Sequence, residues 1–244
     1  VLVSPLTADV LRAGLEIGEK TGGALDITLY AVSQLWDYKS ENPQVPDEAA
    51  VRAALEKSGR GRVCVEGNSV CTGGTQLDLG AIAKGAVGDE VMACLKEQGV
   101  ICALVNLGGN ILTLGEKADG SPWTIAVDSP FGEGYAGRIE VGGGKAVATS
   151  SGAQRYFEKD GVVYHHILDP ETGYPARSGL ASVTVIADDG LTADALSTAL
   201  FVAGEAQAAR ILEEQYPKVG AVLIRDDGSI RTLGDVCFTE EAGA

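Results

Sequence analysis

Five stretches of the chain carry apolar residues at the spacing of an amphipathic helix. The first two run from about 7 to 22 and from 47 to 59, and each opens on a residue that caps helices well and closes at glycine. Three more cover about 81–98, 192–203 and 205–216. The pattern therefore predicts five helices.

Short runs rich in β-branched and other apolar residues fill much of the remaining chain and predict strands. These runs are RVCVE, ICALV, WTIAV, RIEV, AVATS, VVYHHIL, SVTVIA, AVLIR and SIRTL. Asp-Gly pairs at 119-120, 160-161 and 227-228 each separate two such runs, which favours tight hairpins. Because helices and strands do not alternate strictly, we predict an α+β fold, not a doubly wound sheet. We expect one domain over residues 1–244, with a mixed, largely antiparallel sheet core and flanking helices.

The acidic composition limits the partners that the chain can bind. Asp and Glu number 34 against 19 Lys and Arg, and this net charge of -15 disfavours nucleic acid and anionic lipid surfaces. No apolar run approaches the roughly 20 residues that a membrane-spanning helix needs, so we expect no transmembrane segment in this chain. The chain opens at Val1, and we expect a leader, anchor or further segment upstream of it.

The five cysteines are an odd number and lack the paired spacing of a zinc knuckle. One pair stands apart, because a Gly67-Asn68 turn would place Cys64 opposite Cys71 across a hairpin. The sequence leaves open whether these two cysteines form a disulfide or remain free thiols, because this kind of cross-strand pair is not the easiest to bridge.

The stretch QLDLGAIAKGAVGDEV, residues 76–91, predicts a short strand, a glycine and then a helix. The first turn of a helix leaves backbone N–H groups unpaired, and Lys84 in that turn adds positive charge, so the junction suits phosphate. Asp78 at the end of the strand could accept a hydrogen bond from a ring N–H. The alternative is an ordinary helix start with a solvated lysine, because the order of Gly and Lys is not that of a Walker A loop.

Two further loops are candidates for ligand contacts. In VNLGGNIL, Gly108-Gly109 would allow either close backbone approach to a ligand or a simple tight turn. Downstream, a cluster of hydroxyls at 149–151 precedes the only two histidines of the chain, His165 and His166. Because successive strand side chains point to opposite faces, at most one histidine can serve a given site. The rigid turn in HILDPETGYP favours a ligand-binding role for it over a purely structural one.

The helix expected at 192–203 carries oxygen-bearing side chains within an apolar stretch. Asp194, Ser197 and Thr198 share one face, and Mg²⁺ prefers such hard oxygen ligands. Thr192 is the expected N-cap of this helix, which Gly204 would close. The structural alternative is that Asp194 in the first turn complements the helix dipole and Thr198 bonds back to a carbonyl.

Taken together, these stretches resemble the ApbE family, the FAD:protein FMN transferases, from about residue 10 to 235. The resemblance rests on six motifs in family order: TGGALDITLYAVSQLWDY, LDLGAIAKG, NLGGNI, TSSGAQRYF, HHILDPETGYP and ADALSTALF. It implies an α+β fold that binds FAD as substrate, with Mg²⁺ between the pyrophosphate and the ADALSTA helix. The implied reaction transfers FMN to a Thr or Ser hydroxyl of an acceptor protein and releases AMP.

The resemblance also implies a role for individual residues. The side chains of Asp194 and Thr198 would bind Mg²⁺, and carbonyl oxygens of Ala81 and Ser197 would complete its protein ligands. His166 would lie near the reacting phosphate as the catalytic residue. The FAD contacts would come from Ala24, Leu25, Asp26, Asp78, Lys84, Thr149 and Leu168.

Two departures from the family pattern bear on FAD affinity: the sequence starts after an upstream segment that the family carries, and Leu25 stands where members often carry Phe. Two other functions would use the same motifs. One is an FAD pyrophosphatase, in which water replaces the hydroxyl and yields FMN and AMP, and the other is a non-catalytic flavin-binding module. Members generally work outside the cytoplasm, often lipid-anchored, so an extracytoplasmic location is expected.

Overall fold

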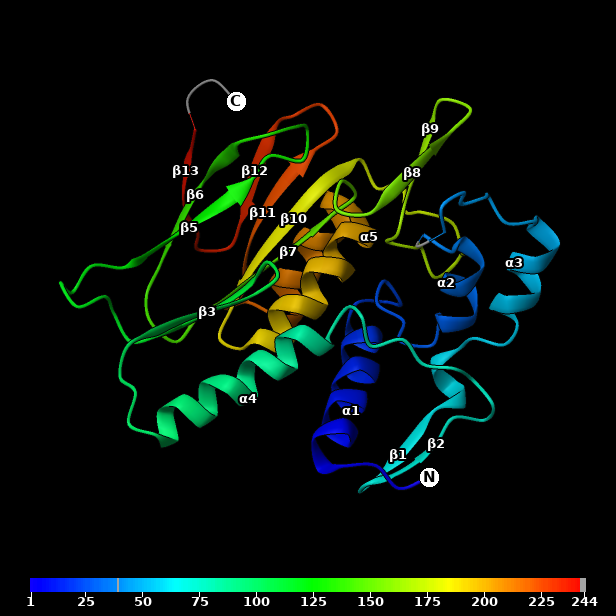
Figure 1. Ribbon diagram of the computed structural model, residues 1–244, viewed down its shortest axis with the longest axis horizontal. Coiled ribbons are helices and arrows are strands. Elements are labelled where there is room, and N and C mark those ends of the chain that lie inside the picture. Colours follow the sequence, from blue (N-terminus) through cyan, green and yellow to red (C-terminus); the bar gives the residue numbers. More distant parts are fainter. Residues whose placement is uncertain (39, 242–244) are drawn as a thin grey trace.

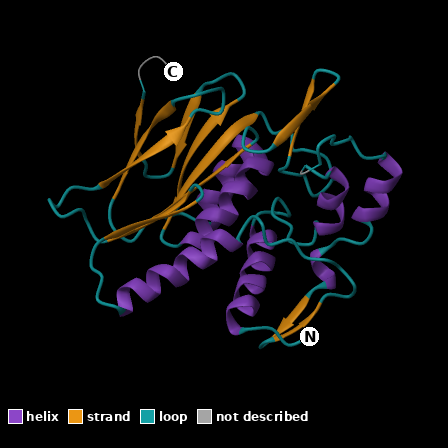
Figure 2. Ribbon diagram, viewed as in Figure 1, coloured by secondary structure: helices purple, strands orange, loops and turns teal. Residues whose placement is uncertain are grey.

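The computed structural model describes residues 1–38 and 40–241 (Figures 1 and 2). Its helices are α1 (Pro5–Lys20), α2 (Tyr30–Trp36), α3 (Glu48–Leu55), the short 3₁₀ helix η1 (Arg60–Arg62), α4 (Ala83–Glu97) and α5 (Gly190–Gln215). Its strands are β1 (Cys64–Glu66), β2 (Ser69–Cys71), β3 (Ala103–Leu107), β4 (Asn110–Leu114), β5 (Trp123–Asp128), β6 (Tyr135–Val141), β7 (Ala146–Ser151), β8 (Tyr156–Lys159), β9 (Val162–His165), β10 (Leu180–Ala187), β11 (Gly220–Arg225), β12 (Ile230–Leu233) and β13 (Cys237–Glu240).

The centre of the fold is a six-stranded sheet in the order β12-β11-β10-β7-β4-β3, with antiparallel neighbours throughout. A three-stranded sheet, β13-β6-β5, packs on one face, and α1, α4 and α5 lie on the other (Figure 2). The prediction of an α+β fold with a largely antiparallel sheet is confirmed.

Both faces of the central strands are buried, so the parity of a residue decides which layer it meets. On β7, Ala148 belongs to the core under the helices, whereas Val147 belongs to the core between the two sheets. On the neighbouring β10, Val185 and Ile186 divide in the same way. Even-numbered residues of β7 therefore face α5.

Helix α5 is two helices joined at Gly204, whose φ of 74° interrupts the helical backbone at the predicted position. The prediction that Thr192 caps this helix is wrong. Asp189 is the N-cap, and its carboxylate accepts a 2.7 Å hydrogen bond from the Thr192 backbone N–H. The helix therefore begins at Gly190, and Asp194 lies in its second turn, beyond the first-turn position that the dipole explanation required.

Three predicted hairpins are confirmed and one is wrong. Turns at 67-68 and 160-161 join β1 to β2 and β8 to β9, and the loop around 227-228 joins β11 to β12. The pair at 119-120 joins β4 to β5, which belong to different sheets. The Asp-Gly sequence favours a tight turn locally, but the packing of the sheets decides which strands pair.

Cys64 lies opposite Cys71 in the register of β1 and β2, as the turn predicted. Both thiols are free and exposed, so the alternative of a disulfide is not the one that the structure adopts.

Residues 76–79, predicted as a strand, belong to no ladder. This segment is fixed instead by a hydrogen bond of 2.7 Å from the Asp78 backbone N–H to the Ile27 carbonyl. A satellite core forms where α2 and α3 meet the loop around Leu168, with the buried Trp36 at its centre. Within the described residues, no helix is both long enough and apolar enough to cross a membrane.

Candidate functional site

The start of α4 lies against the second turn of α5, and one hydrogen bond joins them. The Asp194 side chain is only 5% exposed, and its Oδ2 accepts a 3.0 Å hydrogen bond from the Gly85 backbone N–H. Gly85 is the third residue of α4, so this N–H has no partner within its own helix. The carboxylate thus lies at the first turn of α4, against the residue that follows Lys84.

Glycine is needed at this junction. A Cβ on Gly85 would collide with the carbonyl oxygen of Gly190, and a Cβ on Gly190 would lie 2.5 Å from the carbonyl oxygen of Gly85. The two helix starts can therefore approach this closely only without side chains at both positions.

Ser150 connects the central sheet to the oxygen-bearing face of α5. Its Oγ lies 2.8 Å from Ser197 Oγ and 3.0 Å from Thr198 Oγ1. Ser197 Oγ also donates a 2.8 Å hydrogen bond to the Asp194 carbonyl. The hydroxyls of Ser197 and Thr198 and the backbone carbonyl of Asp194 thus share one polar cluster with Ser150, which belongs to the hydroxyl cluster at 149–151.

The placement of Thr149 differs from the expectation. Its side chain points to the opposite face of the sheet, where its Oγ1 lies 2.8 Å from Thr184 Oγ1 on β10. The hydroxyl that faces α5 is that of Ser150. Because β7 is buried on both faces, the sequence carried no alternation of polar and apolar residues to decide between them.

Lys84 and Asn110 supply the hydrogen-bond donors at one edge of the site. Lys84 Nζ lies 3.4 Å from Asn110 Oδ1, at the start of β4. Asn110 is 2% exposed, and its Nδ2 has no hydrogen-bond partner among the described residues. A buried donor without an acceptor, next to an ammonium group, suits an anion such as phosphate.

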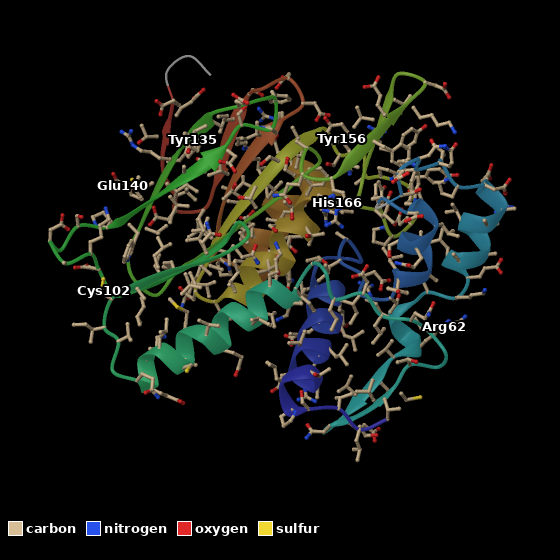
Figure 3. The ribbon with its side chains drawn as sticks, in the orientation of Figure 1. Arg62, Cys102, Tyr135, Glu140, Tyr156 and His166 are labelled. Atoms are coloured by element: carbon tan, nitrogen blue, oxygen red, sulfur yellow. The ribbon has the colours of Figure 1, made fainter. Side chains whose placement is uncertain are left out.

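His166 lies at the base of the β8–β9 hairpin (Figure 3). Its Nδ1 is 3.2 Å from the Arg155 carbonyl oxygen. Because a carbonyl can only accept, Nδ1 carries the proton, and Nε2 keeps a lone pair. Burial lowers the pKa of His166, and the positive charges of Arg155 and Lys84 lower it further. The imidazole is therefore neutral near pH 7 and can accept a proton.

His165 has a structural environment. It is buried, its ring stands edge-on to Phe201, and its Nε2 lies 3.0 Å from the Ala176 carbonyl oxygen. Burial lowers its pKa to about 4. The two histidines therefore lie in different surroundings, as strand alternation predicted.

The predicted FAD segment at 24–26 lies beside Asp78. The Asp26 carboxylate accepts hydrogen bonds from the backbone N–H of Thr28, at 2.8 Å, and from its hydroxyl, at 2.6 Å. Asp78 Oδ1 accepts from the Gly80 N–H at 2.9 Å, and Oδ2 accepts from the Ser33 hydroxyl at 3.2 Å. Both carboxylates thus form part of folded loops.

Other predicted FAD residues are apolar. The side chain of Leu25 is buried in the main core and that of Leu168 in the satellite core, whereas Ala24 is partly buried. Direct FAD contact by the leucines would therefore come from the backbone.

The oxygens at the α4–α5 junction fit Mg²⁺ better than a metal that needs several side-chain ligands. Within the described residues, no three His, Cys, Asp or Glu side chains are grouped to hold a metal ion. One buried carboxylate, that of Asp194, contacts the first turn of α4, and the hydroxyls of Ser197 and Thr198 follow it on α5. Mg²⁺ is bound by few protein ligands, completed by water and substrate phosphates.

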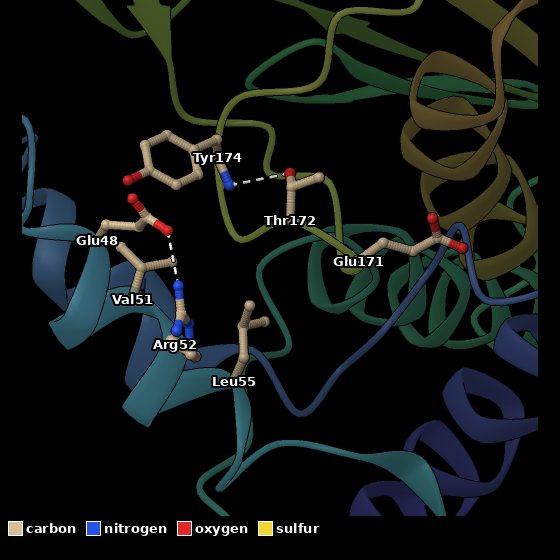
Figure 4. Close-up of a pocket in the computed structure, with 7 residues that line it drawn as sticks. All are labelled: Glu48, Val51, Arg52, Leu55, Glu171, Thr172 and Tyr174. Atoms are coloured by element: carbon tan, nitrogen blue, oxygen red, sulfur yellow. Dashed lines mark hydrogen bonds and ion pairs between the residues drawn. The ribbon is translucent and has the colours of Figure 1, made fainter.

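A separate cleft of about 460 Å³ lies between α3 and the loop before β10 (Figure 4). Its walls include Arg52, Leu55 and Tyr174, and Arg52 is paired with Glu48 at 2.7 Å. None of the predicted site residues lines this cleft. It is therefore not part of the candidate site.

The sequence alone did not predict a role for two residues that join α4 to α5: Gly85, and Asp89, whose carboxylate contacts the start of α5. The available signal was a repeated spacing. Gly85 and Asp89 are four residues apart, and so are Gly190 and Asp194.

The sequence model of the ApbE family matches residues 1–223. The chain is 36% identical over 245 residues to the FAD:protein FMN transferase of Treponema pallidum (strain Nichols), covering 93% of this chain and 67% of that protein. It is 36% identical over 231 residues to the enzyme of that name from Vibrio cholerae serotype O1, covering 93% and 69%. The chain thus spans about two thirds of the length of these relatives.

Solved structures give the same result. The ApbE protein of Thermotoga maritima superimposes with a TM-score of 0.86 at 37% identity, covering 96% of this chain and 77% of that one. The flavin transferase ApbE from Vibrio cholerae gives a TM-score of 0.82 at 33% identity, covering 95% and 76%.

Proposed function

The chain belongs to the ApbE family of FAD:protein FMN transferases, and on that premise we propose that it transfers FMN from FAD to a Thr or Ser hydroxyl of an acceptor protein in a Mg²⁺-dependent reaction that releases AMP. The observation that carries this proposal is the contact between Asp194 and Gly85. It brings a buried carboxylate to a helix start that also carries Lys84.

The start of α4 would receive the pyrophosphate of FAD. The ammonium of Lys84 and the unpaired Nδ2 of Asn110 would donate hydrogen bonds to phosphate oxygens, assisted by the positive end of the helix. Asn110 is buried before the substrate arrives, so its amide would need little reorganisation when charge develops on the phosphoryl oxygens.

Asp194, Thr198 and the carbonyl oxygens of Ala81 and Ser197 would hold Mg²⁺. When bound, this ion neutralises phosphate charge and polarises the phosphorus for attack. Asp194 would otherwise repel the two phosphates, so we expect FAD binding to depend strongly on the cation.

His166 would act as a general base. The Nδ1–H···O=C bond to Arg155 leaves Nε2 free to take the proton of the acceptor hydroxyl. The hydroxyl oxygen forms a bond to the FMN phosphorus as the bond to the AMP oxygen breaks. Positioning and charge neutralisation supply most of the catalysis in such a transfer.

The test is to incubate the chain with FAD, MgCl₂ and a library of peptides that each carry one Thr, with Thr→Val peptides as matched controls. We expect a subset of Thr peptides to gain the mass of an FMN phosphoester while AMP appears in equal amount. The Val peptides should stay unchanged.

Two results would contradict the proposal in different ways. AMP and free FMN formed at the same rate with and without peptide would indicate an FAD pyrophosphatase. FAD that binds but stays intact with every peptide would indicate a non-catalytic flavin-binding module.

A further inference from the structure

Asp89, on the second turn of α4, caps the first turn of α5. Its Oδ1 accepts a 2.6 Å hydrogen bond from the Gly190 N–H, and its Oδ2 accepts a 2.9 Å bond from the Leu191 N–H. Asp189, the N-cap of α5 itself, takes the Thr192 N–H. The first three N–H groups of α5 are therefore all satisfied, two of them by another helix.

The arrangement is reciprocal, because α5 returns the same contact to α4. Asp194 lies four residues after Gly190 and accepts from the Gly85 N–H, and Asp89 lies four residues after Gly85 and accepts from the Gly190 N–H. In each helix the glycine permits the close approach and the aspartate one turn later caps the partner. We call these four residues the crossed caps.

The crossed caps link two segments that are about 100 residues apart in the chain and that meet where Figure 1 shows α4 against α5. Asp194 belongs both to the crossed caps and to the proposed cation site. Asp89 is one helical turn further along α4 than the Ala81–Lys84 turn. It fixes where α5 begins, and thereby the position from which the Asp194 carboxylate reaches that turn.

We propose that Asp89 is a positioning residue, which holds the α5 start so that Asp194 and the Ala81 carbonyl can bind one cation together. The inference rests on the proposed function, since the cation is part of it. Asp89 does not itself contact the substrate. Outer partners that orient metal ligands typically affect metal affinity by about 10- to 100-fold when they are removed.

The test compares Asp89→Ala with Asp189→Ala, which removes the α5 cap that comes from α5 itself. Two readouts are used: FAD affinity with Mg²⁺ and with EDTA, and hydrogen exchange of the Gly85 amide without any ligand. For Asp89→Ala we expect the enhancement of FAD affinity by Mg²⁺ to fall about tenfold or more, affinity in EDTA to stay unchanged, and Gly85 exchange to accelerate. Asp189→Ala should leave the Mg²⁺ enhancement and Gly85 protection as in the natural chain.

The inference would be overturned if Mg²⁺ enhanced the FAD affinity of Asp89→Ala as much as that of the natural chain. It would also be overturned if Asp89→Ala and Asp189→Ala lost this enhancement to the same extent. If Asp89→Ala does not fold, Asp89→Asn replaces it, because the amide oxygen can still accept a hydrogen bond from one N–H. We expect Asp89→Asn to lose a smaller part of the Mg²⁺ enhancement of FAD affinity. An unchanged enhancement in this variant would overturn the inference. A natural chain whose FAD affinity ignores Mg²⁺ would contradict the proposed function. The cation part of the inference then fails as well, and the Gly85 exchange rate decides only whether Asp89 fixes the start of α5: faster exchange in Asp89→Ala supports that role, and unchanged protection overturns it.

Discussion

The carboxylate of Asp194 and the backbone N–H of Gly85 are joined by a 3.0 Å hydrogen bond that crosses from α5 to α4. This contact gives Asp194 a structural role as well as the proposed role in binding Mg²⁺. A first-turn residue that only complements the helix dipole would contribute about 0.3–1 kcal/mol. The observed bond is buried, so its loss should cost more.

Asp194→Ala should lower the free energy of unfolding by about 1–3 kcal/mol, because the Gly85 N–H would be left buried without an acceptor. Asp194→Asn should lower it less, since the amide oxygen can still accept this bond. Both variants should lose the Mg²⁺ dependence of FAD binding. Urea unfolding and FAD titration separate the two roles, and a Mg²⁺ response retained in Asp194→Asn would count against the site.

Ser150→Ala and Thr149→Ala form a matched pair on opposite faces of β7. Each removes one hydroxyl with a hydrogen-bonded neighbour, so each should lower stability by about 1 kcal/mol. Only Ser150→Ala should weaken the response of FAD affinity to Mg²⁺, about tenfold, because Ser150 holds the Thr198 hydroxyl. If both variants changed the response of FAD affinity to Mg²⁺ equally, the face of β7 on which a hydroxyl lies would have no bearing on cation binding.

His166→Gln should reduce the transfer rate by about 100-fold or more while FAD affinity in Mg²⁺ stays unchanged. In the natural chain, burial and the charges of Arg155 and Lys84 lower the pKa of His166 below 6.5. The transfer rate should therefore fall as the pH is lowered, with a midpoint below pH 6.5. A rate profile measured from pH 4 to 8 tests this, and a midpoint at or above 6.5 would argue against His166 as the base.

His165 should make the fold sensitive to acid, because its pKa is about 4 in the folded state and near 6.5 when unfolded. The unfolded chain then binds the extra proton between these values, so stability is full above about pH 6.5 and falls as the pH drops toward 4. At pH 5 the loss should be about 2 kcal/mol. Urea unfolding at pH 7 and pH 5 measures this loss in the free energy of unfolding. His165→Gln should not show the part of the loss that is due to His165, and its amide can still donate a hydrogen bond to the Ala176 carbonyl. An identical loss in both chains would mean that other groups cause it.

The sequence was sufficient for much of the fold and for one face of the site. Helical spacing placed Asp194, Ser197 and Thr198 together, and turn chemistry placed the hairpins at 67-68 and 160-161. These signals are local, since residues a few positions apart determine them.

The remaining features depend on which elements pack together. The Asp-Gly pair at 119-120 has the chemistry of a hairpin turn, yet the two strands beside it join different sheets. Thr149 and Ser150 could not be separated because both faces of β7 are buried. The contacts from Gly85 to Asp194 and from Asp89 to Gly190 join distant segments, and the repeated Gly-x-x-x-Asp spacing gains meaning only once α4 and α5 are known to touch.

The most direct test of the account is the affinity of the natural chain for FAD with Mg²⁺ and with EDTA, measured by titration at one ionic strength. The cation would offset repulsion between the Asp194 carboxylate and the two phosphates, so we predict at least about tenfold tighter binding with Mg²⁺. Equal affinity in the two conditions would contradict the claim that the α4–α5 junction holds a cation against the pyrophosphate.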